Sequence, residues 1–416
     1  MNTLLRRDAA TSSTVAVLLC LALLVNYIDR GSISIAAPLL QSEFSLSSAD
    51  MGWVFSAFFW TYVIFQPISG ALADRFGPER VLVCGLALWS VATIMTGLSS
   101  GLFGLIAFRL VMGASESVFY PSGLSILASR VADRFRARAT GVMQFGSYVG
   151  PALGAFVGGM VMNRFGWRAM IMSLGVLSML WLIPWIRLIG LKRAPPATQA
   201  GTSTPRRATY TQILSQRALW AAMLGTFCGN YMFFLMFTWM PLYLQRQRGL
   251  PADTSQLYAT LFYIAEAASV LISGWVIDRW IVRGATPNRA YKMALGLSCV
   301  AVCVCLLACA RVGIAGLPIV LILMGLADGL AGPSNCSITQ IMAGSVATGR
   351  WMGLQNAVGN VAGILAPIVT GYIVQETGHY TLALVIASIV ALVGAFAWVV
   401  LMPTVSPVRW GAAQTV

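Results

Sequence analysis

The chain has 416 residues, of which 58 % are hydrophobic and only 10 % are charged, and its mean hydropathy is +0.78. Soluble proteins carry about 25 % charged residues, so this composition excludes an ordinary water-soluble enzyme or binding domain. The surplus apolar surface needs lipid as its solvent, which predicts an integral membrane protein.

The formal net charge is +14, from 27 basic and 13 acidic residues. In a soluble protein this excess would indicate nucleic-acid binding, whereas in a membrane protein it gathers in cytoplasmic loops. The eight cysteines all lie in apolar runs without metal-ligand spacing, so we interpret them as small core residues and expect no metal site. They are Cys20, Cys84, Cys228, Cys299, Cys303, Cys305, Cys309 and Cys336.

Apolar runs long enough to cross a bilayer, roughly 20 residues each, recur along the whole chain. Six precede a basic, Pro/Thr/Ala-rich segment at 191–216, and six follow it. This pattern predicts an all-α membrane protein with two six-helix bundles, 1–190 and 217–416, joined by a cytoplasmic linker at 191–216. The twelve predicted spans are 14–39, 50–73, 81–99, 101–128, 138–162, 167–190, 217–244, 254–279, 290–310, 313–342, 350–375 and 379–402.

The basic residues are distributed unequally between the two sets of loops. Twenty lie in the loops and helix ends on the side of both termini, and two lie inside spans. This asymmetry places both termini in the cytoplasm and assigns the positive charge to topology rather than to nucleic-acid binding. The five on the opposite side are Arg164, Arg168, Arg246, Arg248 and Arg311.

The two halves repeat a short motif at corresponding helix ends. Residues 70–80 read GALADRFGPER, and residues 274–280 read GWVIDRW. In both, an Asp-Arg pair follows a glycine by four residues. Two repeated sets of six helices are typical of a secondary transporter whose binding site lies between the halves at mid-membrane.

Several stretches together resemble the major facilitator superfamily and, within it, the anion:cation symporter family of sugar-acid, vesicular glutamate and sialic acid transporters. The resemblance covers about residues 15–402, and it implies the two-bundle fold of that superfamily. The stretches are the 70–80 loop, NYIDR at 26–30, FFWTYVIFQPISG at 58–70, FRLVMGASESVFYP at 108–121, NYMFFLMFTWMPLYL at 230–244 and GLQNAVGNVAGILAP at 353–367.

The repeated helix-end motifs supply candidate gating residues. By resemblance, the first loop latches the cytoplasmic side in the outward-open state, with the glycine allowing close helix contact. The alternative is that these residues serve only as an orientation signal. The candidates are Gly70, Asp74, Arg75, Asp278 and Arg279.

Four charged residues lie inside spans of the first half, where each costs at least ~2.5–3.5 kcal/mol and usually marks a transport pathway. Arg109 and Glu116 are seven residues apart and so share one helix face. The resemblance implies that Arg30 binds the substrate carboxylate, that Asp29 and Glu116 carry protons, and that Arg109 is their charge partner. The alternative is a structural ion-pair cluster. The lone histidine, His379, lies at a span end, which leaves proton transfer to carboxylates.

The second half contains two further intramembrane acids, Glu266 and Asp328, with no basic residue in their spans. Each is a candidate proton site, an acceptor for substrate hydroxyls, or a neutral hydrogen-bonded acid, and these three interpretations stay open here.

Polar residues in the spans are candidate substrate contacts. Tyr62 matches a substrate-contacting tyrosine of the family, whereas Ser147 stands where sugar-acid members often have Gln. Helix–helix hydrogen bonding is the alternative role for the rest. The complete candidate binding set is Arg30, Tyr62, Arg109, Ser147, Asn230, Tyr231, Thr339, Gln340, Asn356 and Asn360.

These features predict a proton-coupled symporter that imports an organic carboxylate, such as an aldonate, aldarate or uronate, by rocker-switch alternating access. The alternatives are a proton-driven exporter of an organic anion or drug, and an importer of an aromatic acid or dicarboxylate. We expect no enzymatic activity and no cofactor other than the proton gradient. We also expect a monomer in the inner membrane whose partners are the anion, protons and lipid.

Overall fold

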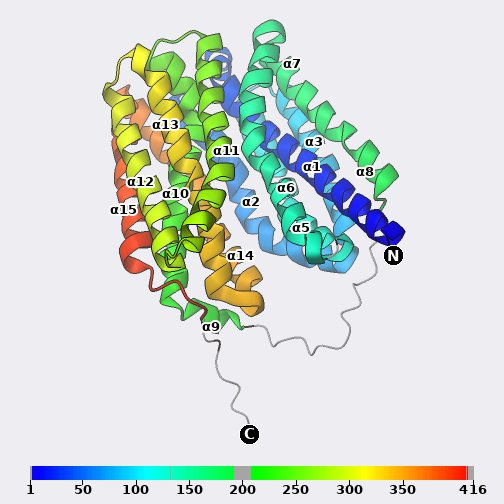
Figure 1. The fold of residues 1–416 in the computed structure, drawn as a ribbon. Coiled ribbons are helices and arrows are strands. Elements are labelled where there is room, and N and C mark those ends of the chain that lie inside the picture. The colour runs from blue at the N-terminus through cyan, green and yellow to red at the C-terminus, as the bar shows by residue number, and fades with distance from the viewer. Residues whose placement is uncertain (1, 132, 192–207, 409, 411–416) are drawn as a thin grey trace. The chain divides into compact units, whose positions relative to one another are not determined.

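A computed structural model describes residues 2–131, 133–191, 208–408 and 410, which are helical almost throughout and contain no strand (Figure 1). The chain forms two compact units. Unit 1 consists of Met1–Ala200, Phe237–Tyr263 and Pro367–His379, and unit 2 consists of Gly201–Met236, Ile264–Ala366 and Tyr380–Val416.

Unit 1 contains the first six predicted spans. The second helix begins at a capping box, in which Ser47 and Asp50 satisfy each other's backbone N–H groups. It ends at Gly77, whose φ of 91° and following Pro78 make the tight turn into the next helix. The elements are α1 (Asn2–Glu43), α2 (Ser48–Phe76), α3 (Pro78–Gly97), α4 (Leu102–Glu116), α5 (Phe119–Arg130), α6 (Asp133–Leu153), η1 (Gly154–Gly158), α7 (Gly159–Leu180) and α8 (Leu182–Leu188).

The remaining spans are divided between the two units. Phe237–Tyr263 and Pro367–His379, which belong to unit 1, take in parts of α10, α11 and α14. In unit 2, α12 packs against α13 and α15. The elements are α9 (Tyr210–Leu214), α10 (Arg217–Leu242), η2 (Tyr243–Gln247), α11 (Ala252–Val282), α12 (Pro287–Arg311), η3 (Ile314–Gly316), α13 (Leu317–Gly329), α14 (Ala331–Thr377), α15 (Thr381–Phe396) and η4 (Ala397–Leu401).

Two glycines break long helical runs where the sequence predicts loops. Eleven helical stretches are long and apolar enough to cross a membrane, and the longest, Arg138–Leu188, has 51 residues. Gly166, at φ 82°, breaks that stretch between two predicted spans, which gives the twelve crossings. Gly344, at φ 61°, likewise separates the two predicted spans inside α14. The twelve-helix prediction is confirmed. Positive φ favours glycine at such turns, because a Cβ clashes with the backbone there.

The predicted linker lies mostly outside the described residues, since 192–207 are not described. Its end contains the short helix α9, which begins at a capping box formed by Thr209 and Gln212. The division into 1–190, 191–216 and 217–416 stays a prediction.

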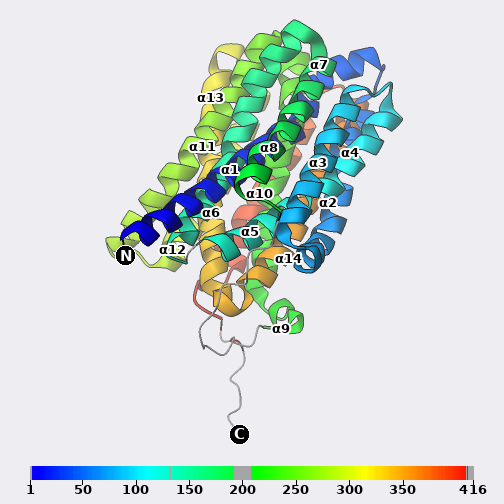
Figure 2. The ribbon, with the colours of Figure 1, turned by 90° about the vertical axis from the view of Figure 1, so that its right-hand side faces the viewer.

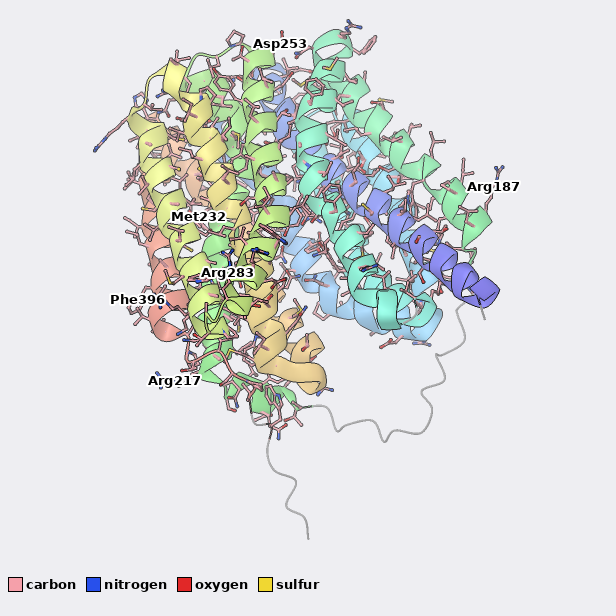
Figure 3. All side chains as sticks on the ribbon, viewed as in Figure 1. Arg187, Arg217, Met232, Asp253, Arg283 and Phe396 are labelled. Atoms are coloured by element: carbon pink, nitrogen blue, oxygen red, sulfur yellow. The ribbon has the colours of Figure 1, made fainter. Side chains whose placement is uncertain are left out.

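Large apolar side chains cover much of the outer surface, as expected for a protein in lipid. Phe396, labelled on α15 in Figure 3, is 52 % exposed, and Leu297 and Val304 on α12 are also exposed. The interpretation of the cysteines as core residues is wrong for Cys84, which is exposed on α3, while Cys20 and Cys336 are half-buried. An apolar run faces both lipid and core, so hydropathy alone does not separate the two.

Helices α1 and α6 lie side by side in unit 1 (Figure 2), and glycines of α6 allow their close contact. A Cβ at Gly146 would lie 2.3 Å from the Cys20 carbonyl oxygen, and one at Gly150 would lie 2.7 Å from that of Leu24. These glycines belong to the stretch GSYVGPALG at 146–154, which resembles a motif of drug/proton antiporters. In this chain they serve helix packing.

We expect Gly146→Ala to lower the thermal unfolding midpoint of the purified protein in detergent. The new methyl group must displace backbone, and overpacking of this kind costs about 1–3 kcal/mol. The matched control is Gly141→Ala on the same helix, because a Cβ there meets nothing within 4 Å. Equal midpoints for the two variants would contradict the packing argument.

Candidate functional site

Arg30 lies inside unit 1 on α1 and is 3 % exposed. Its guanidinium carbon lies 4.8 Å from the ring centre of Tyr27, 4.5 Å from that of Phe58 and 5.0 Å from that of Tyr62. Phe58 and Tyr62 are one turn apart on α2 and stack on each other at 5.3 Å. Three aromatic rings around a cation stabilise it by cation–π attraction while they exclude water.

Glu116 neutralises Arg30 directly. The Arg30 Nη2 and Nε atoms donate to one oxygen, Glu116 Oε2, at 2.9 and 3.3 Å, and Nη2 also donates to Asn26 Oδ1 at 3.2 Å. Glu116 is fully buried at the end of α4, immediately before the break that precedes α5. Its second oxygen, Oε1, has no hydrogen-bond partner among the described residues. The ion pair therefore engages only half of the Glu116 carboxylate.

Arg109 lies beside this pair but forms no ion pair within the described ranges. Its Nη1 donates to the Arg30 carbonyl oxygen at 3.4 Å, and its guanidinium lies 5.2 Å from the ring centre of Phe58. The family resemblance implies that Arg109 is the charge partner of the acids, whereas this structure pairs Glu116 with Arg30. Arg109 still interacts with Glu116 through space, as their shared helix face predicts.

Asp29 is fully buried next to Arg30 in the chain, and its partner is a hydroxyl. Ser178 on α7 donates to Asp29 Oδ2, while Oδ1 has no hydrogen-bond partner in the described structure. Glu116 therefore pairs with a cation, whereas Asp29 accepts a hydrogen bond from a neutral hydroxyl.

Sequence reasoning missed several neighbours of this site. Asn26 and Tyr27 precede Arg30 by one helical turn, a spacing that places them on its face and could have identified them. Phe58 likewise precedes Tyr62 by four residues. Nothing in the sequence indicates Ser178, because a single serine in an apolar span is common.

Ser147 on α6 is 9 % exposed, and its hydroxyl donates to the Gln144 carbonyl oxygen of its own helix at 2.7 Å. The other candidate contacts lie in unit 2. Asn230 and Tyr231 are on α10, and Thr339, Gln340, Asn356 and Asn360 are on α14.

The unit 2 candidates differ in their surroundings. Thr339 is buried and donates to Gln355 Oε1 at 2.8 Å. Asn360 donates to the Asn356 carbonyl oxygen at 2.8 Å, while the Gln340 and Asn356 side chains are exposed. The structure thus ties Thr339 to the part of α14 beyond the break at Gly344 but leaves Gln340 outside that contact.

Glu266 on α11 and Asp328 on α13 interact electrostatically in unit 2. The two helices approach closely there, since a Cβ at Gly329 would lie 2.4 Å from the Glu266 carbonyl oxygen. Neither acid has a Lys or Arg at ion-pair distance in the part of the chain that the structure describes.

The candidate gating residues lie at exposed helix ends. Asp74 and Arg75 end α2, and Asp278 and Arg279 lie near the end of α11. Among the described residues, a Cβ at Gly70 meets nothing within 4 Å, so this part of the structure shows no close helix contact at Gly70.

A further ion pair beside the first loop motif escaped the sequence analysis. Arg130 Nε lies 2.8 Å from Oε1 of Glu79, and Glu79 is fully buried at the start of α3. This pair joins α3 to α5.

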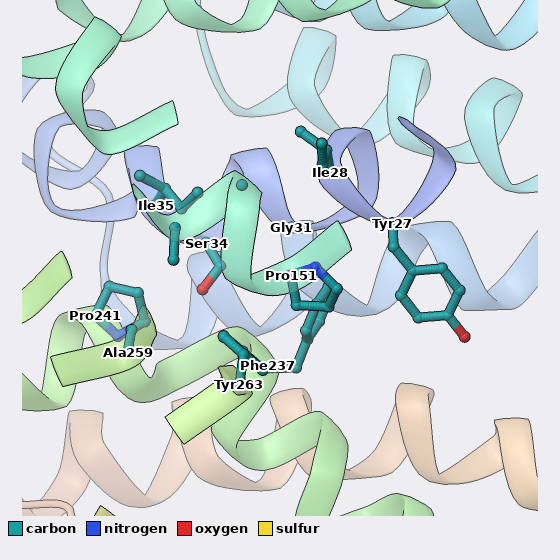
Figure 4. A pocket seen from close by; sticks show the side chains of 12 residues that line it. Tyr27, Ile28, Gly31, Ser34, Ile35, Pro151, Phe237, Pro241, Ala259 and Tyr263 are labelled. Atoms are coloured by element: carbon teal, nitrogen blue, oxygen red, sulfur yellow. The ribbon is translucent and has the colours of Figure 1, made fainter. Parts of the chain in front are cut away.

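A small pocket lies in unit 1 (Figure 4). We call the rings of Tyr27, Phe58 and Tyr62 around Arg30 the aromatic cage. Tyr27 lines both the pocket and the cage around Arg30. The hydroxyl of Ser34, one of the lining residues, donates to the Thr238 carbonyl oxygen at 2.7 Å. Its O–H donor is therefore already used. None of the predicted binding residues lines it. The lining side chains come from α1, α6, η1, α10 and α11 and are mostly apolar.

Comparison with known proteins agrees with this architecture. A crystal structure of a bacterial homologue of the human lysosomal transporter Spinster, inward-facing and occupied, superimposes with a TM-score of 0.73 at 18 % identity, covering 94 % of each chain. Fold and sequence together define a multi-span membrane transporter rather than an enzyme. The sequence profile of the Major Facilitator Superfamily matches residues 19–287 and 249–415, and the chain belongs to that family.

The curated relatives support the expected branch of the family. The chain is 30 % identical over 408 residues to a probable L-galactonate transporter of Escherichia coli K12, covering 94 % of this chain and 89 % of the relative. It is 27 % identical over 399 residues to the hexuronate transporter of Bacillus subtilis 168, covering 92 % and 93 %. The resemblance to bacterial sugar-acid transporters is thereby confirmed.

The ion pair makes a prediction about stability. Arg30→Gln or Glu116→Gln alone leaves an uncompensated buried charge, so each should destabilise the substrate-free protein by about 3–5 kcal/mol. The double variant, which contains neither charge, should recover much of that loss. A double-mutant cycle of unfolding in detergent measures the coupling.

The control cycle uses Arg168→Gln and Glu43→Gln, an ion pair of unit 1 whose side chains are 40 % and 41 % exposed. Surface pairs couple by about 0–1 kcal/mol. Additive losses at Arg30 and Glu116 would contradict a direct pair.

Proposed function

We propose that this chain is a proton-coupled symporter that imports a sugar acid or a related organic carboxylate by alternating access. The observation that carries the proposal is the Arg30–Glu116 pair, a buried guanidinium engaged by one oxygen of one carboxylate. The names of the sugar-acid transporters among its relatives support the substrate class.

Arg30 suits an anionic substrate because its planar fork binds both oxygens of a carboxylate and stays charged at every physiological pH. The aromatic rings around it remove competing water, which strengthens the attraction. The same positive charge repels cationic drugs, which argues against a cationic-drug exporter.

Glu116 and the substrate compete for the same guanidinium. When Glu116 takes a proton, it loses its charge and its hold on Arg30, and the substrate carboxylate replaces it. When the proton leaves, Glu116 is charged again and re-forms its ion pair with Arg30, which releases the substrate. Anion and proton therefore occupy the site together, which is the requirement for symport.

Asp29 is the second candidate proton carrier, since its carboxylate relies on the Ser178 hydroxyl. One proton makes the import of a monoanion electrically neutral, and a second would add about 2.3 kcal/mol per 100 mV of membrane potential. Two acids at one site would therefore permit steep accumulation.

The experiment that tests the function measures uptake of labelled galactonate, glucuronate, glucarate and an aromatic acid into proteoliposomes. We expect one acid to accumulate with an inward proton gradient and to lose that accumulation when the gradient is collapsed. Arg30→Ala and Arg30→Lys should both abolish uptake, because lysine lacks the fork. Arg187→Ala is the control, as this arginine is exposed on α8 (Figure 3). Faster exit of an acid against incoming protons would favour an exporter.

Proton coupling makes a separate prediction. Glu116→Gln imitates the protonated acid, so it should retain exchange of external for internal anion while losing accumulation driven by the pH gradient. Asp29→Asn tests the second proton in the same two assays. Normal gradient-driven accumulation in both variants would contradict the roles given to these acids.

A further inference from the structure

Four uncharged side chains form a hydrogen-bonded network inside unit 2, and only Thr339 among them was a candidate from the sequence. Thr226 comes from α10, and Asn335, Thr339 and Gln355 come from the parts of α14 on either side of the break at Gly344. Thr339 and Gln355 are 1 % and 5 % exposed. The network therefore joins three of the predicted spans.

Gln355 lies at the centre and uses its whole amide group. Its Oε1 accepts from the Thr339 hydroxyl at 2.8 Å, and its Nε2 donates to Thr226 Oγ1 at 2.7 Å and to Asn335 Oδ1 at 2.6 Å. A primary amide has two N–H donors, so both are engaged. In this arrangement the Gln355 oxygen is held on the Thr339 hydroxyl and the amide nitrogen faces Asn335.

This direction of donation decides what Asn335 presents. Its Oδ1 accepts from Gln355 and also from Thr226 Oγ1 at 3.4 Å. Its Nδ2 has no hydrogen-bond partner among the described residues, and the side chain is partly exposed. Two N–H donors are thus held in a fixed orientation at the edge of a network that is otherwise satisfied.

Asn230, a candidate contact from the sequence, lies against the same part of unit 2. A Cβ at Gly359 would lie 2.8 Å from Asn230 Nδ2 and 2.9 Å from the Thr226 methyl carbon, so both side chains pack on this glycine. The free Asn335 donors therefore belong to a larger polar region of α10 and α14.

We propose that Asn335 is a specificity-determining residue of unit 2, donating its free N–H groups to a carboxylate or hydroxyl oxygen of the transported anion, and that Gln355 is its positioning residue. The inference rests on the proposed function. Its physical basis is that a site built to hydrogen-bond a polar group rejects analogues that lack this group.

The test begins with the wild-type protein, which must accumulate one labelled acid of the panel. If it transports none, the proposed function fails, and the role of Asn335 fails with it. If it transports one, KM and maximal rate for that acid are measured for each variant, together with the unfolding midpoint in detergent.

Asn335→Ala removes the donors, and Gln355→Glu replaces the donating amide with an acceptor of the same shape. A carboxylate at position 355 only accepts hydrogen bonds, so Asn335 must turn its Nδ2 toward that residue. Its oxygen would then face the anion. We expect both to raise KM by about tenfold or more, as for the loss of a hydrogen bond to a charged group, with a smaller change in maximal rate.

Thr339→Val and Thr339→Ser form a matched pair that changes no charge. Valine removes the hydroxyl that fixes the Gln355 amide, so KM should rise. Serine keeps the hydroxyl and should restore KM. If Thr339→Val and Asn335→Ala lower the unfolding midpoint but leave KM at the wild-type value, the network is structural and the inference is overturned.

Discussion

Burial of the Arg30 charge within a membrane-spanning helix is the constraint on which the candidate site depends. An isolated guanidinium there would be costly, and the structure compensates it with one carboxylate, one amide oxygen and three aromatic faces. These groups come from α1, α2 and α4, so the charge of Arg30 links these three helices. A buried ion pair is seldom the most stable solution, because apolar residues of similar volume often pack as well. The pair fits the proposed role of Arg30 in binding the substrate carboxylate.

The polar chemistry of the two units differs in kind. Unit 1 buries several formal charges, among them Asp29, Arg30, Arg109 and Glu116. The Gln355 network of unit 2 is uncharged, and its hydrogen bonds do not depend on pH. Under the proposed function, the charged groups supply binding strength and proton coupling, while the amide network supplies directional contacts to the oxygens of the anion. Glu266 and Asp328 are the exception in unit 2, as an acid pair without a basic partner in the described residues.

Close helix contacts support both arrangements. Gly146 and Gly150 bring α6 against α1, the helix that carries Asp29 and Arg30. Gly359 makes room for Asn230 and Thr226 on α10. In a membrane, where burial of apolar surface does not drive helices together, small residues gain packing by letting backbones approach. The glycines therefore help to set the distances between polar groups as well as the fold.

The sequence by itself determined the membrane class, the twelve spans and the charged residues inside those spans. Those properties are local, since a span needs only enough consecutive apolar residues and an intramembrane charge stands out against them. Only the tertiary structure decided which partners meet. Glu116 pairs with Arg30 rather than Arg109, Asp29 meets Ser178, Cys84 faces outward, and Gln355 binds Thr226 and Asn335. These contacts depend on the rotation and height of helices that are far apart in the chain. Hydropathy does not specify either quantity, because most residues that face lipid and most that face the core are alike in being apolar.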